Sequence, residues 1–188
     1  MEQVFNRVAK WNALRYAQEY NHELAVKLLR EEQREWMEAD NLVDRVHELC
    51  DVVFVAFGVM WKLDQEITPE AAKDCFKITD EMSGRFNDPA TLCSATIDCL
   101  ERADNLDLRL SYAFTTSLFA QSQMLDYGLT FEQIIECMLV LCDSNDSKAV
   151  KKTESHVKAN VNGNKGAFYR SPVPGIAAIV EQIQCRVN

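Results

Sequence analysis

Apolar residues recur every three or four positions along most of the chain, which is the spacing that places side chains on one face of an α-helix. No segment shows the pattern of a parallel sheet, so the sequence predicts an all-α fold built as a helical bundle. Helices are expected at residues 3–19, from 22 to a polar break at 39–44, from that break to 61, at 68–86, 91–103 and 106–127, from about 131 to 148, and at 176–186.

Polar residues, proline and glycine mark several of these boundaries. The pairs at 68–69 and 88–89 each place a cap residue before a proline at the first helical position. Gly128 is expected to end one helix, and residues 130–133 form a capping box that starts the next. Asp44 closes the polar break and can cap the helix that follows it. Two helices joined by so short a break should fold back antiparallel.

The helices on either side of this break carry acidic residues at helical spacing. Residues three or four apart lie on one face of a helix, and at about 1.5 Å per residue the two acidic sets fall at matching heights above the turn. Clustered carboxylates repel one another unless a positive charge lies among them, and hard oxygen ligands suit Mg²⁺ or Mn²⁺. The sequence therefore predicts a metal site between two helices. Its candidate residues are Glu31, Glu32, Glu35, Glu48 and Asp51.

An acidic run on a helix is more often a solvated face, because Glu is a good helix former. The second helix argues against that interpretation, since it is apolar almost all round between Val46 and Trp61, as a buried helix is. Glu48 and Asp51 interrupt this apolar surface, and buried carboxylates are costly unless they are paired or bound to metal. A helix that is apolar all round must be packed against other helices on every side, and the other helices of a single chain are not expected to be enough. This favours a homodimer, with an interface formed by residues 68–127.

Two histidines near these acids are not predicted to be ligands. His47 forms a D-x-x-H pair with Asp44, but a di-iron bundle needs Glu-x-x-His on each of two helices, and no second pair appears. His22 is expected to be a surface or capping residue at the start of its helix.

Four short motifs resemble those of one enzyme superfamily. They are E-E-x-x-E at residues 31–35, E-x-x-D at 48–51, S-N-x-S-K at 144–148 and K-G-x-x-Y at 165–169. With them the chain resembles the all-α nucleoside triphosphate pyrophosphohydrolases, which include MazG-like proteins, phosphoribosyl-ATP pyrophosphohydrolase and the dimeric dUTPases. Asp146 stands where the third motif has Met. The resemblance covers about residues 5–58 and 127–174.

The resemblance implies a Mg²⁺-dependent enzyme that attacks the α-phosphorus of a (d)NTP and releases a nucleoside monophosphate and pyrophosphate. It implies that the metal ligands are Glu32, Glu35, Glu48 and Asp51, with Glu31 orienting the attacking water or holding an additional metal. The residues implied to grip the substrate are Asn145, Lys148, Lys165 and Tyr169. Trp11 and Asn12 become candidates for a base pocket. A homodimer or a dimer of dimers is also implied.

Other functions stay open at this point. Phosphoribosyl-ATP pyrophosphohydrolase is the alternative substrate assignment within the superfamily. Carboxylates with Mg²⁺ would by themselves equally fit a phosphatase or a nuclease, and a non-catalytic helical dimer would use the acids only for solubility.

Residues 148–174 form a predicted basic flap. Between residues 148 and 170 six basic residues stand against the single acid Glu154, whereas residues 31–51 hold eight acids and two arginines. This complementary charge favours a flap that lies near an anion. Residues 162–163 are Asn-Gly, a type I′ hairpin signal, so both a small two-stranded turn and a disordered loop are open.

The composition narrows the class of protein. A chain of 188 residues with 47% hydrophobic content fits one domain, residues 1–188, with a sizeable core. Its formal charge of −9 disfavours a nucleic-acid partner, which requires basic surface. No apolar run suits a membrane span or a signal peptide, so we expect a cytoplasmic protein with no membrane partner. The seven cysteines lack a C-x-x-C pair and are expected to be reduced core residues.

Overall fold

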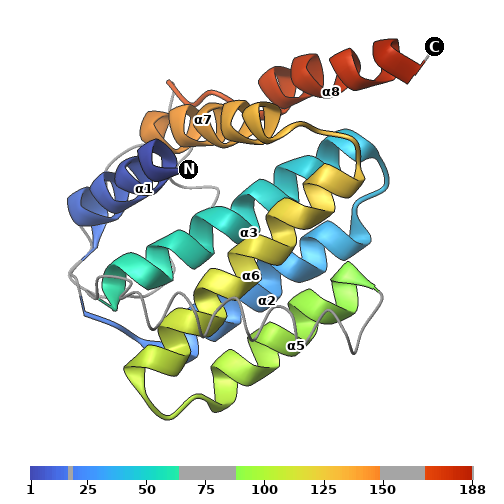
Figure 1. Cartoon of the computed structure of the whole chain (residues 1–188). Coiled ribbons are helices and arrows are strands. Elements are labelled where there is room, and N and C mark those ends of the chain that lie inside the picture. Colours follow the sequence, from blue (N-terminus) through green and yellow to red (C-terminus); the bar gives the residue numbers. More distant parts are fainter. Residues whose placement is uncertain (17–18, 64–87, 149–167, 188) are drawn as a thin grey trace.

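The computed structural model describes residues 1–16, 19–63, 88–148 and 168–187, and the elements in these ranges are all α-helices (Figure 1). They are α1 (Glu2–Arg15), α2 (His22–Glu38), α3 (Leu42–Lys62), α5 (Pro89–Arg102), α6 (Leu106–Asp126), α7 (Phe131–Ser147) and α8 (Val173–Val187). The predicted all-α class is confirmed for this part of the chain. The helix expected at 68–86 and the flap residues 149–167 lie outside the described residues.

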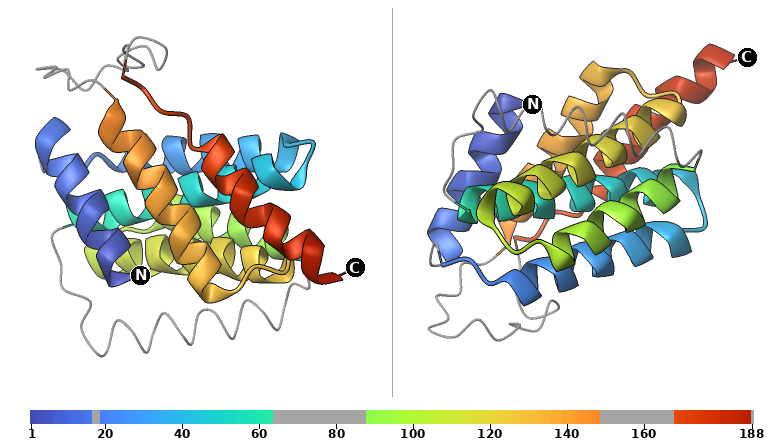
Figure 2. Two further views of the ribbon diagram at one scale, coloured as in Figure 1. Left: turned by 90° about the horizontal axis from the view of Figure 1, so that it is seen from above. Right: turned by 60° about the horizontal axis from the view of Figure 1, so that its bottom comes forward.

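Four of the helices form a bundle, and the other three lie across it. In the bundle α2 packs against α3 and α5, and α6 packs against the same two helices from the other side. The helices α1, α7 and α8 lie side by side over α3 (Figure 2). None of the helices in the described ranges has the length and hydropathy needed to cross a lipid bilayer.

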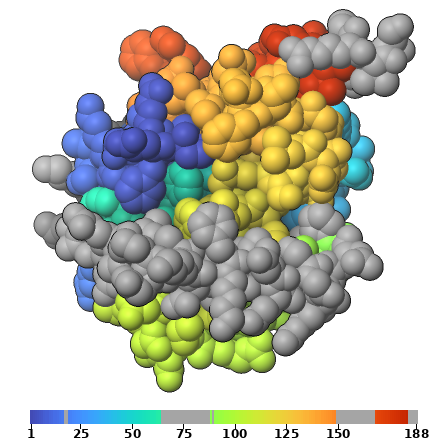
Figure 3. All heavy atoms as spheres, in the orientation of Figure 1, coloured from blue at the N-terminus to red at the C-terminus, as the bar shows by residue number. Residues whose placement is uncertain are grey.

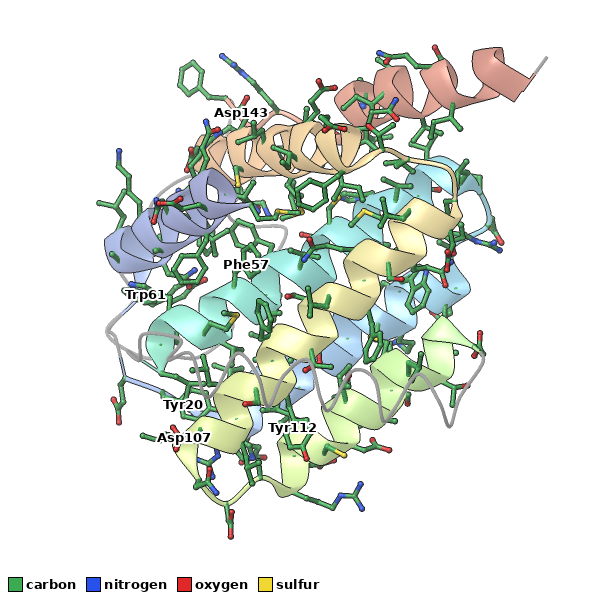
Figure 4. All side chains as sticks on the ribbon, in the orientation of Figure 1. Tyr20, Phe57, Trp61, Asp107, Tyr112 and Asp143 are labelled. Carbon is green, nitrogen blue, oxygen red and sulfur yellow. The ribbon has the colours of Figure 1, made fainter. Side chains whose placement is uncertain are left out.

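The central element is α3. Every residue from Val52 to Met60 except Val55 is buried, because α2 and α6 cover one side of α3 and α1, α7 and α8 cover the other. Figure 4 shows Phe57 on α3, and its ring meets Phe5 of α1 edge to face with 5.5 Å between the ring centroids. The expectation that one copy would not cover this helix fully is therefore wrong, since helices of the same chain surround it.

The five cysteines whose side chains the structure describes are free thiols, and four of them are buried. This agrees with the prediction that they are reduced core residues. They are Cys50, Cys93, Cys99, Cys137 and Cys142.

Several predicted boundaries are confirmed by side-chain caps. Asp88 caps α5 through the backbone N–H of Thr91, and Thr130 with Gln133 forms the complete capping box of α7. Gly128 ends the preceding helix with a φ of 91°, a left-handed conformation that glycine adopts at little cost.

Three boundaries differ from the prediction. Asn41 rather than Asp44 caps α3, because its side chain accepts from the Asp44 backbone N–H and its amide donates to the Asp44 carboxylate. The first helix ends at Arg15 instead of Glu19, since Tyr16 is extended. The last helix begins at Val173 rather than Ile176. Proline is tolerated in the first turn of a helix, because the N–H that it lacks would have no partner within the helix there.

Gly175 lets α8 lie close to α7, and this contact can be tested. A Cβ at Gly175 would lie 2.7 Å from Cγ1 of Val140, whose branched side chain cannot easily turn away. We expect Gly175→Ala to lower the free energy of unfolding by about 1–3 kcal/mol through overpacking.

The matched control removes the neighbour instead. In a Val140→Ala background the same Gly175→Ala change should raise the free energy of unfolding by about 0.4–1 kcal/mol, because only the entropic advantage of Ala over Gly remains. Chemical denaturation measures both values. Equal effects in the two backgrounds would contradict this packing.

Candidate metal centre

The turn between α2 and α3 brings the two acidic motifs together. Asn41 caps α3, and Nε of Arg45 donates to the Ala39 carbonyl at the end of α2, 3.1 Å away, so both sides of the turn are fixed. The apolar stripe of α2, which includes Leu29 and Trp36, faces the bundle. The carboxylates on the adjacent face of α2 then meet those of α3.

The first group consists of carboxylates alone. Oxygens of Glu32 and Glu35 from α2 and of Glu48 from α3 all lie within 4.8 Å of one another. Glu35 is exposed and the other two are partly buried, so the group opens to solvent on one side. Three of the four predicted metal ligands thus gather at one place.

The second group contains the fourth predicted ligand, Asp51, together with His47. In this group Nδ1 of His47 lies 3.1 Å from Oε1 of Glu48, and Nε2 of His47 lies 3.2 Å from Oδ2 of Asp51. The side chains of His47, Glu48 and Asp51 are 20%, 17% and 22% exposed, respectively. Glu48 belongs to both groups, so the two groups form one continuous cluster.

Among the described residues, the negative charges around this cluster outweigh the positive ones. Burial raises the pKa of the Glu32 carboxyl to about 9, and the negative charges of its neighbours add to the effect, in the order Asp51, Glu35, Glu48 and Glu31. Burial and then the charges of Glu48 and Glu31 also raise the pKa of Glu35. Glu32 therefore keeps its proton at neutral pH in the absence of a cation.

Asp51 has two positive neighbours. Burial raises the pKa of its carboxyl to about 6, while the charges of His47 and Lys148 lower it. Burial is also the largest effect on the pKa of His47 and lowers it, but the hydrogen bond to Glu48 and the charges of nearby acids raise it above its ordinary value overall. His47 thus partly neutralises Glu48 and Asp51.

Sequence reasoning missed His47 as a member of this cluster. The D-x-x-H pattern pairs His47 with Asp44, on its N-terminal side, and not with Asp51. The available signal was the spacing of four residues between His47 and Asp51, which places both side chains on one face of a helix.

Glu31 lies in neither group. It lines a cavity of about 610 Å³ with Glu101 and with residues of α2. The other lining residues are His22, Glu23, Val26, Lys27, Arg30 and Arg34. His22 is held in the wall of this cavity by Tyr20 and by the Glu101 carbonyl, in line with a structural role.

The C-terminal end of α7 lies near Asp51. The charge of Lys148, the cap residue of α7, lowers the pKa of Asp51, so its ammonium lies within electrostatic range of that carboxyl. Asn145 is buried in the last turn of the same helix. The chain returns to this turn at Tyr169 and Arg170, where the Arg170 backbone N–H donates to Oγ of Ser147 across 2.9 Å. Lys165 lies outside the described residues.

The two candidates for a base pocket take part in the packing of α1. Asn12 is buried against Gly58, and its Nδ2 donates to the Val8 carbonyl across 2.9 Å. Trp11 packs edge to face on Phe54, and its Nε1 donates to the Asn145 carbonyl across 2.9 Å. The contacts of both residues therefore attach α1 to α3 and α7.

The donor set suits a divalent cation. Three carboxylate oxygens within reach of one ion, with excess negative charge around them, fit Mg²⁺ or Mn²⁺. Once it has lost its proton, His47 would add a nitrogen donor from the group that contains Asp51, and Mn²⁺ accepts nitrogen more readily than Mg²⁺.

Comparison of the chain with family models, with curated proteins and with solved structures finds no match. The case for a function therefore depends on the residues and their geometry.

The raised pKa of Glu32 predicts how stability depends on pH. The carboxyl titrates near 4.5 in the unfolded chain and near 9 in the fold, so the folded state binds this proton more tightly. The free energy of unfolding of the metal-free protein should fall as the pH rises from 5 to 9. Glu32→Gln should flatten this dependence, because the amide does not titrate.

Thermal unfolding in EDTA across this pH range checks the prediction. Added Mg²⁺ should raise the melting temperature more at pH 8 than at pH 6, because the ion competes with the proton. Glu136→Gln, which changes an exposed glutamate of α7, serves as the control and should keep the wild-type slope. A wild-type slope in the Glu32→Gln protein would contradict the assignment.

Proposed function

We propose that the chain is a Mg²⁺-dependent nucleoside triphosphate pyrophosphohydrolase that cleaves a (d)NTP to a nucleoside monophosphate and pyrophosphate. One observation carries the proposal. Four of the five carboxylates of the E-E-x-x-E and E-x-x-D motifs form a single cluster, and the charge of Lys148, the lysine of the S-N-x-S-K motif, acts on its Asp51. This supports a single site built from three motifs that are separate in sequence and resemble one superfamily.

The acidic cluster would hold the metal. Glu32 and Glu35 would supply carboxylate oxygens from α2, and Glu48 and Asp51 would supply them from α3. A bound Mg²⁺ or Mn²⁺ neutralises phosphate charge and makes water a better nucleophile. Without a cation, four carboxylates would repel a polyphosphate, so the metal dependence follows from electrostatics.

The chain's own residues would orient the substrate. Lys148 offers a compact positive charge within electrostatic range of Asp51, where it could contact phosphate oxygens. Asn145 and Tyr169, at the same end of α7, carry side chains that give directional hydrogen bonds. Glu31, beside the carboxylate group but not in it, would orient the attacking water.

The choice of reaction depends on the motifs. Carboxylates and a divalent cation also suit phosphatases and nucleases, but the formal charge of −9 disfavours a nucleic-acid substrate. Attack at the α-phosphorus is what the resemblance to the pyrophosphohydrolases implies.

A phosphate-release assay on a panel of nucleotides tests the function. With Mg²⁺ present, we expect phosphate from at least one (d)NTP only when inorganic pyrophosphatase is added, because the first product is pyrophosphate. Phosphate release without that enzyme would indicate a phosphatase. No release from any nucleotide in the panel would favour the non-catalytic alternative.

Glu48 is the most informative residue for mutation, because it belongs to both groups of the cluster. Glu48→Gln keeps the shape of the side chain and removes its charge, so we expect kcat to fall by about a hundredfold or more while the far-ultraviolet circular dichroism is unchanged. Glu136→Gln is the matched control and should keep wild-type kcat. Full activity in the Glu48→Gln protein would exclude this metal site.

We also propose that the chain forms a homodimer, or a dimer of dimers, through residues 68–127. The resemblance to a dimeric group supports this assembly. Sedimentation velocity at micromolar concentration should give the mass of two or four chains. A monomer alone would contradict the proposal.

A further inference from the structure

We propose that Arg15 is a positioning residue: it holds the last turn of α7, which carries Lys148, against the turn of α3 that carries Asp51. This inference rests on the proposed function of the site. It concerns how α1, at the start of the chain, controls a substrate-binding lysine more than 130 residues away in sequence.

The end of α7 needs a positive partner. The last carbonyls of a helix have no partners within it and carry partial negative charge, and the last turn of α7 contains no basic residue. The guanidinium of Arg15 supplies that partner. Its Nη2 donates to the Lys148 carbonyl across 3.0 Å and reaches the Asn145 carbonyl at 3.4 Å.

Arg15 is itself held in place by Trp11. The guanidinium carbon of Arg15 lies 4.6 Å from the centroid of the Trp11 ring, and Nη1 of Arg15 donates to the Trp11 carbonyl across 3.4 Å. The indole N–H of Trp11 donates to the Asn145 carbonyl, which Arg15 also contacts. The Asn145 carbonyl at the end of α7 therefore accepts hydrogen bonds from two side chains of α1, those of Trp11 and Arg15.

The same tryptophan links this turn to the metal centre. Trp11 meets Phe54 edge to face with 5.2 Å between the ring centroids, and Phe54 lies three residues after Asp51 on α3. The contacts from Arg15 to Trp11 and from Trp11 to Phe54 thus join the turn that carries Lys148 to the turn that carries Asp51.

A second arginine of α1, Arg7, neutralises two carboxylates near Lys148 in sequence. Nη1 of Arg7 lies 2.8 Å from Oδ1 of Asp143, and its Nη2 contacts the carboxylate of Asp146. Asp143 is labelled in Figure 4 on α7, and Figure 3 shows α1 and α7 side by side on one face of the molecule. Arg7 and Arg15 are two turns apart on α1, so together they keep the end of α7 in register and less repulsive to an anion.

The chain contains a close control for Arg15. Nε of Arg109 donates to the carbonyl of Ala103, the cap residue at the end of α5, across 3.0 Å, and its guanidinium carbon lies 5.7 Å from the centroid of the Tyr20 ring. Arg109 thus makes the same two kinds of contact as Arg15, on a helix that carries none of the candidate site residues.

The experiment compares Arg15→Ala, Arg15→Lys, Arg109→Ala and Lys148→Ala in the full chain. We expect Arg15→Ala to change the same kinetic parameter as Lys148→Ala, kcat or KM, by about tenfold. Arg15→Lys should restore part of the loss, because an ammonium can still donate to a carbonyl. Arg109→Ala should stay within about twofold of wild type in both parameters, since it makes the same kind of contact elsewhere.

Hydrogen exchange gives a reading that does not depend on turnover. The backbone amides at residues 145–148 should exchange faster in Arg15→Ala than in Arg109→Ala or wild type. Unchanged exchange there, or kinetics of Arg15→Ala equal to those of Arg109→Ala, would overturn the proposal. A wild-type protein with no turnover on any nucleotide would instead overturn the proposed function, while the exchange data would still show whether Arg15 holds α7.

Discussion

Repulsion among four carboxylates is the constraint around which the molecule is arranged. The side chains of Glu32, Glu35, Glu48 and Asp51 are held together because α2 and α3 are fixed at their turn and packed along their apolar faces. Burial makes this repulsion stronger, as the pKa of about 9 at Glu32 shows. A proton on Glu32, the His47 ring and the Lys148 ammonium relieve part of it, and a divalent cation would relieve most of it. A cluster that costs stability in the metal-free protein is what a metal-dependent site requires.

The local features of the fold could be predicted from the sequence. The spacing within E-E-x-x-E and E-x-x-D placed the acids on helix faces, and the short break between them implied an antiparallel pair. The sequence predicts the caps at Asp88 and Thr130 and the helix end at Gly128, because each of them depends on only a few neighbouring residues. The sequence favours Asp44 as the cap of α3, whereas the structure has Asn41. Both residues are good caps, and only the backbone conformation decides between them.

The tertiary features could not be predicted in the same way. The burial of α3 between Val52 and Met60 comes from helices at both ends of the chain, and no local sequence pattern predicts which helices these are. The place of His47 between Glu48 and Asp51 depends on a rotamer as well as on spacing. The approach of α1 to the end of α7 depends on contacts such as Arg15 with Lys148 and Arg7 with Asp143, which join residues far apart in sequence. The motif at 144–148 predicts substrate-binding residues, but only the fold shows that α7, which carries the motif, packs against α3, which carries Glu48 and Asp51.

Calorimetric titration of the protein with Mn²⁺ at pH 7, in two buffers of different ionisation enthalpy, tests the central claim most directly. If the carboxylates form a metal centre, Mn²⁺ should bind and release about one proton, from Glu32, because a ligand must lose its proton to coordinate. The Glu48→Gln protein should lose most of the affinity. Absence of binding at millimolar Mn²⁺, or equal binding by the Glu48→Gln protein, would contradict the account.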